Sequence, residues 1–106
     1  GKKLPHGKER LTKVSELVSV SQLLPEGVND AMIMLDEAKR LKVDTMQAMA
    51  LAFIVNHHYM YDDRLDSVVY WVNYGMKVAR KCKKWNLFFE MQYTLVNTYI
   101  YNERFE

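Results

Sequence analysis

His57 and His58, followed by Asp62 and Asp63, are residue types that could bind a metal ion. Metal ligands on one helix need a spacing of three or four residues, which places them on the same face. Adjacent histidines point about 100° apart, so only His58 and Asp62 have that spacing. Two ligands make at best a weak site. We therefore expect one groove residue and one packing or capping residue here, and no metal.

Cys82 is the single cysteine, which excludes an internal disulfide and a site built from several cysteines. It lies within the basic run 77–84, and no histidine lies nearby in the sequence to activate a thiol. The basic run could touch phosphate or acidic protein, although its ordinary role at a helix end is to complement the helix dipole. The chain also lacks a Gly-rich phosphate loop and a Ser/His/Asp arrangement. We expect no enzymatic activity and no cofactor.

Composition limits the other function classes. The chain has 106 residues, enough for one small domain, with 49% apolar and 26% charged residues, two prolines and four glycines, which favours long helices over a turn-rich β fold. A net charge of +2 is far from the basic footprint of a nucleic-acid binder. No run of 18 apolar residues occurs, so we expect no membrane insertion by this segment. The compartment stays open between the cytoplasm and, for a membrane-anchored sensor, the periplasm.

Apolar residues recur at three- and four-residue steps in five segments. Breaks at Pro25–Gly27 and Asp62–Arg64 separate some of them, and Asp44 with Gln47 resembles a capping box at a helix start. We expect a flexible lead-in at 1–9 and one all-α domain at 10–106. The predicted helices span residues 11–24, 28–41, 44–61, 65–81 and 85–101.

An internal repeat joins these helices. Tyr59–Asp66 matches Tyr99–Glu106 in kind at every position, 40 residues later. Small or β-branched residues recur at a spacing of 37 residues between the second and fourth helices: Ala31, Leu35 and Ala38 correspond to Val68, Val72 and Gly75. Such periods of helical hairpins indicate a solenoid, in which one repeat buries its apolar face against the next.

The pattern resembles the tetratricopeptide repeats over roughly residues 11–106. Tyr59 falls at the aromatic position of the first helix, and Leu65 at the one after the turn; Tyr99 and Phe105 fill these places in the last repeat. Asn56 and Val96 depart from the pattern, which usually has glycine or alanine there. The resemblance implies a right-handed α-solenoid of about two and a half repeats, 11–43, 44–84 and a truncated 85–106. Repeats this long look like those attached to bacterial regulators and sensor proteins.

The resemblance also implies which side chains face the concave inner wall. These are Lys13, Glu16, Val20 and Leu23 in the first repeat, Ala50, Phe53, His57 and Met60 in the second, and Glu90, Tyr93, Asn97 and Ile100 in the third. Such a wall suits a protein or peptide ligand, and the Asn97 amide can donate to and accept from a peptide backbone. We therefore expect a non-catalytic binding module, the sensory or regulatory segment of a bacterial signalling protein.

A different role is also open. The fifth helix has no following partner helix in this sequence, so its face through Leu95, Tyr99 and Tyr101 would lie open to water. The alternative prediction is a structural module that forms a homo-oligomer through this face.

Overall fold

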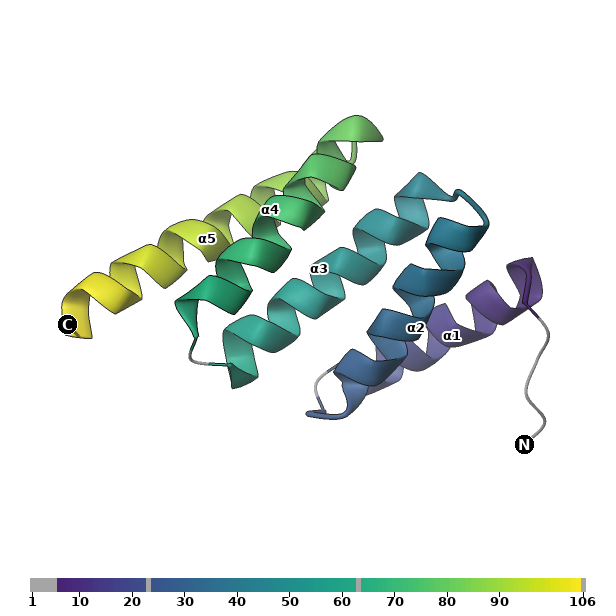
Figure 1. The fold of residues 1–106 in the computed structure, drawn as a ribbon, viewed down its shortest axis with the longest axis horizontal. Helices are drawn as coiled ribbons and strands as arrows, with labels where there is room; N and C mark the ends of the chain where they lie inside the picture. The colour runs from purple at the N-terminus through teal and green to yellow at the C-terminus, as the bar shows by residue number, and fades with distance from the viewer. Residues whose placement is uncertain (1–5, 23, 63, 106) are drawn as a thin grey trace.

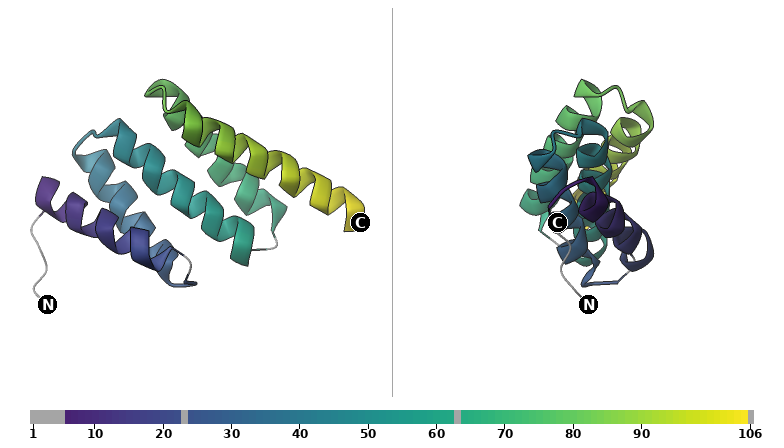
Figure 2. Two further views of the ribbon diagram at one scale, coloured as in Figure 1. Left: turned by 180° about the vertical axis from the view of Figure 1, so that it is seen from behind. Right: turned by 90° about the vertical axis from the view of Figure 1, so that its right-hand side faces the viewer.

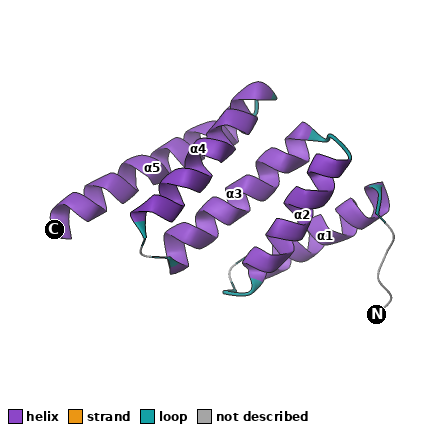
Figure 3. Ribbon diagram, in the orientation of Figure 1, coloured by secondary structure: helices purple, strands orange, loops and turns teal. Residues whose placement is uncertain are grey.

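The computed structural model describes residues 6–22, 24–62 and 64–105. For residues 104 and 105 it describes the backbone alone. Within these ranges the chain forms helices joined by turns and contains no strand, which confirms the expected all-α class (Figure 3). Residues 1–5 of the expected lead-in lie outside the described residues, and its expected end at residue 9 is wrong, because Lys8 and Glu9 belong to the first helix. The five helices are α1 Lys8–Ser21, α2 Gly27–Arg40, α3 Asp44–Tyr61, α4 Leu65–Lys81 and α5 Trp85–Phe105.

The helices lie in two layers. Helices α1, α3 and α5 form one layer and α2 and α4 the other, as the front and back views show (Figures 1 and 2). Each helix packs on the next along the chain, and α3 also contacts α5 within its own layer. The molecule measures 48 × 29 × 18 Å, so it is about two helices thick.

Small residues let these layers approach closely. All six positions that the 37-residue spacing relates on α2 and α4 are buried. At Gly75, a built Cβ would lie only 2.3 Å from Met91 Sδ of α5 and 3.4 Å from Leu51 Cβ of α3. Helices α3, α4 and α5 therefore meet at Gly75, where any side chain would crowd the contact.

The turns α2–α3 and α4–α5 have the same conformation. Lys42 and Lys83 adopt the left-handed region, with φ of 57° and 59°. The amide after Lys42 donates to the Ala38 carbonyl at 2.9 Å, and the amide after Lys83 donates to the Ala79 carbonyl at 2.8 Å. Both are Schellman helix ends, and they recur 41 residues apart.

Helix α5 is longer than the sequence predicted. Its expected end near Tyr101 is wrong, because the helix continues to Phe105. The Asn102 amide donates back to the Thr98 carbonyl at 2.8 Å, a bond made within the helix. The sequence match between Tyr59–Asp66 and 99–106 therefore does not produce a second turn.

The corresponding turn after α3 is held by a carboxylate. Asp62 Oδ1 accepts from the Arg64 amide at 2.9 Å, and Asp62 Oδ2 lies 3.0 Å from His58 Nδ1. The first contact gives the Arg64 N–H a hydrogen-bond acceptor just after the helix ends, and the second ties Asp62 to the last turn of α3.

The capping box expected at the start of α3 is also wrong in its detail. Helix α3 begins at Asp44 as expected, but Val43 occupies the N-cap position and no side chain caps the helix. Gln47 Nε2 instead donates to Asp44 Oδ1 at 3.3 Å.

Candidate functional site

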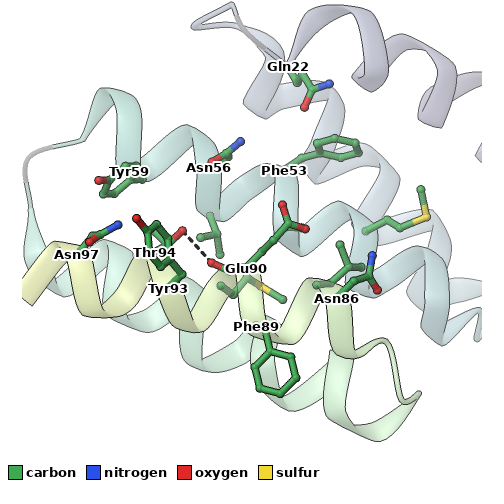
Figure 4. Close-up of a pocket in the computed structure, with 15 residues that line it drawn as sticks. Gln22, Phe53, Asn56, Tyr59, Asn86, Phe89, Glu90, Tyr93, Thr94 and Asn97 are labelled. Carbon is green, nitrogen blue, oxygen red and sulfur yellow. Dashed lines mark hydrogen bonds between the residues drawn. The ribbon is translucent and has the colours of Figure 1, made fainter.

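An open groove of about 720 Å³ lies between α3 and α5. Its two walls are the helices of one layer, and Gln22 at the end of α1 reaches the same hollow (Figure 4). Met49, Ala52, Phe53, Val55, Asn56 and Tyr59 line it from α3, and Asn86, Leu87, Phe89, Glu90, Met91, Tyr93, Thr94 and Asn97 line it from α5. The size is that of a ligand pocket.

Besides Gln22, three asparagine side chains lie along this groove. Asn56, Asn86 and Asn97 each line it, and none of these amides hydrogen-bonds another described residue. An amide of this kind can donate and accept at once. The walls thus offer several hydrogen-bond donors and acceptors that have no partner among the described residues.

Aromatic rings and one carboxylate complete the walls. The Phe53 ring extends toward Gln22, and Glu90 projects from α5 into the space between the helices (Figure 4). Tyr59 and Tyr93 are 45% and 69% exposed, so their rings are open to a ligand. The Phe89 ring points outward from the rim (Figure 4). A segment in this groove would meet apolar surface interrupted by polar groups and one negative charge.

Four of the predicted concave residues come together in this groove: Phe53, Glu90, Tyr93 and Asn97. Ala50 does not, because its side chain is fully buried in the core. Helix α3 packs against α2, α4 and α5, so a wide arc of it is buried and Ala50 falls inside that arc. The prediction that Ala50 faces a ligand is therefore wrong.

The other predicted concave residues lie elsewhere. Lys13 and Glu16 are exposed on α1, where Lys13 Nζ lies 3.8 Å from Glu16 Oε2, but neither residue lines the groove. Val20 is also exposed on α1, and Leu23 lies outside the described residues. Met60 lines a second hollow of about 540 Å³ between the end of α3 and the C-terminal half of α5. The two hollows adjoin, because Tyr59 lines both.

His57 is half-buried beside the groove and does not line it. Its Nδ1 atom is buried without a hydrogen-bond partner among the described residues, and its ring centroid lies 5.0 Å from that of Tyr61. Burial lowers the pKa of His57 below 6.5, and the neighbouring His58 lowers it further. The lowered pKa favours the neutral form of His57 at neutral pH, and its ring packs beside that of Tyr61.

His58 and Asp62 form a pair at the end of α3. The His58 ring stacks on Trp71 of α4, with centroids 5.8 Å apart. The Arg64 amide, and then the bond from His58, lower the pKa of the Asp62 carboxyl. In the part of the chain that the structure describes, no three His, Cys, Asp or Glu residues are grouped to hold a metal ion. The pair stabilises the helix end and its turn.

The residues predicted for self-association do not share one face. Leu95 packs against the core, whereas Tyr99 and Tyr101 are exposed. Two residues along a helix are about 200° apart, so these tyrosines point to different sides of α5. This is a correction: the exposed apolar stripe of α5 consists instead of Trp85, Phe89, Tyr93, Val96 and Ile100, at spacings of 4, 4, 3 and 4 residues.

The sequence-based predictions missed several positions that line the groove. They treated Asn56 only as a departure from the family pattern and did not consider Asn86, yet both line the groove. A usable signal existed for Asn56, because a single amide interrupts the apolar segment 50–55 just before the histidines. The helical spacing of the stripe on α5 was likewise visible in the sequence.

None of the described helices has the length and apolar character that crossing a bilayer requires. Comparison of the chain with models of protein families, with curated proteins and with solved structures finds no match.

Proposed function

We propose that this chain is a tetratricopeptide-like helical repeat module that binds a polypeptide segment in the groove between α3 and α5 and catalyses no reaction. Three features support the repeat assignment. The helices alternate between two layers, the small residues of α2 and α4 are buried at matched positions, and the same Schellman turn recurs after 41 residues. A right-handed solenoid of hairpins would produce all three.

The single observation that carries the binding proposal is the set of unpaired amides in an aromatic-lined groove. Asn86 and Asn97 are 11 residues apart on α5, which separates them by about 16 Å along the helix axis. That length matches about five residues of extended peptide. Each amide can satisfy a backbone donor and acceptor that the ligand would otherwise have to desolvate without a partner.

A random-peptide selection on the immobilised protein tests the proposal. Selected peptides should bind with affinities that fall about fivefold in each of Asn56→Ala and Asn97→Ala, since each variant removes one hydrogen-bonding amide. Asn73 is an exposed asparagine on α4, in the other layer, so Asn73→Ala is a matched control and should leave affinity unchanged. Equal loss in all three variants, or no enriched peptide, would contradict the proposal.

A second candidate is self-association through the apolar stripe of α5, which is favoured by its exposure. Large apolar surfaces left open in water commonly mark an interface. Sedimentation velocity should then show a dimer that dissociates in a Phe89→Ser/Ile100→Ser variant. A wild-type chain that stays monomeric at high concentration would exclude this second role.

Membership in a bacterial regulator or sensor protein stays a prediction. The reading frame on both sides of this segment would test it.

A further inference from the structure

One end of the molecule carries a basic edge, formed by Lys42, Arg80, Lys81, Lys83 and Lys84. All five side chains are exposed and come from the two Schellman turns. The turns are adjacent in space, because Cys82 Sγ lies 3.9 Å from the Asp44 carbonyl oxygen and Lys81 Nζ lies 3.8 Å from Asp44 Oδ2.

These cations are mostly unpaired. Lys81 pairs with Asp44, while Lys42, Arg80, Lys83 and Lys84 form no ion pair with a described residue. The C-terminal ends of α2 and α4 contribute roughly half a negative charge each. These partial charges are small compared with five cations, so complementing the helix dipoles explains only part of the positive charge at this edge.

The backbone at the edge supports a role for the charge itself. Lys42 and Lys83 occupy the left-handed position that favours glycine. The same unfavourable residue type thus stands at both turns, where it places a cation at the tip of each.

The basic edge is close in sequence to one end of the groove. Asn86, which lines that end (Figure 4), lies two residues after Lys84, and the groove-lining Met49 lies five residues after Asp44. A segment that leaves the groove at this end runs toward the turn that carries Lys83 and Lys84, and charges interact over roughly 8 Å at physiological ionic strength. Further along the groove, Glu90 would repel a carboxylate.

We propose that the polypeptide bound in this groove carries acidic residues beside its groove-bound segment, on the side that leaves past the basic edge. The inference rests on the proposed function and names the class of ligand. The charge pattern along the site is then positive at the mouth and negative at Glu90. It selects ligands with an acidic flank and an apolar or donor-bearing centre.

The random-peptide selection distinguishes this inference from the proposed function when it is run on three proteins at about 50 mM NaCl. Peptides selected on the wild-type chain should be enriched in Asp and Glu at one end and in apolar residues at the centre. A Lys83→Glu/Lys84→Glu variant should retain the apolar enrichment and lose the acidic one. A Lys8→Glu/Lys77→Glu variant has the same net charge, with its changes on exposed positions of α1 and α4, and should keep both.

Direct binding gives the size of the effect. An acidic-flanked peptide should bind the Lys83→Glu/Lys84→Glu variant about tenfold more weakly than the wild type, and the difference should shrink at about 500 mM NaCl. Apolar enrichment without acidic enrichment would overturn this inference and leave the proposed function intact. No enrichment over a Phe53→Ala/Asn97→Ala protein would remove both. Binding to phosphatidylserine vesicles that only the edge variant loses, without acidic enrichment, would assign the edge to a membrane surface and overturn the inference.

Discussion

Gly75 is the position where a single added methyl group tests the packing of three helices. A built Cβ lies 2.3 Å from Met91 Sδ and 3.2 Å from Met91 Cε, while Leu51 Cβ is at 3.4 Å. Relief of the shortest contact requires a displacement of about 1 Å, since ordinary van der Waals contacts between such atoms begin near 3.5 Å. Met91 is 2% exposed, and its Sδ and Cε atoms are the flexible end of a side chain that also lines the groove, so relief of the contact has to displace this end.

We expect Gly75→Ala to destabilise the fold by about 1–2 kcal/mol. Overpacking a core costs roughly 1–3 kcal/mol, and the better helix propensity of alanine returns about 0.5–1 kcal/mol. Urea denaturation followed by circular dichroism at 222 nm measures this difference. Because Met91 also lines the groove, its displacement should additionally weaken peptide binding.

A double-mutant cycle provides the control. Met91→Ala alone should destabilise the protein by creating a cavity, but in the Gly75→Ala background the same change also removes the clash. The two changes should therefore couple favourably, by about 1 kcal/mol. Gly75→Ala with unchanged or raised stability, or strict additivity with Met91→Ala, would refute the packing argument.

Three further outcomes follow from the turns and the titrating groups. Lys42→Gly and Lys83→Gly should each stabilise the fold by about 0.5–1 kcal/mol in thermal denaturation, because glycine adopts the left-handed region without strain. As a control, Lys77→Gly inside α4 should destabilise the fold by about 1 kcal/mol. The pKa of His57 is lowered by burial, so the unfolded chain takes up a proton first as pH falls below 6.5. The free energy of unfolding should decrease there, and His57→Gln should flatten this dependence. The pKa of Asp62 is also lowered, so its contribution is present above 3.8 and is lost as pH falls further, and Asp62→Asn should reduce acid sensitivity in that lower window only.

Most helices could be predicted because the residues that start and stop a helix lie close to its ends in the sequence. Helix α4 has the predicted bounds, Leu65–Lys81, since the sequence indicated a break at Asp62–Arg64 before it and a basic cluster closes it. The end of α5 was not predictable from the repeat match alone. Asp62 and Asn102 look equivalent in sequence, yet the carboxylate accepts from the next turn and the amide donates back into its own helix.

The candidate site was predictable only in part. Phe53, Tyr93 and Asn97 were assigned to the groove through the family resemblance, and they line it. Ala50 and Leu95 were misplaced because their orientation depends on how many neighbours each helix has. Helix α3 is apolar around most of its circumference, so its periodicity does not reveal which arc faces the groove.

The matched turns have a consequence for engineering the length of this protein. If segments 44–84 and 85–105 begin at equivalent helix starts, a duplicate of residues 44–84 inserted after Lys84 would add one hairpin and leave both lysine turns as they are. Each added unit would extend the wall of α3-type helices and contribute its own interface to the stability of the whole. Such a duplicated chain should unfold at a higher temperature than the parent, and it would offer room for a longer guest peptide.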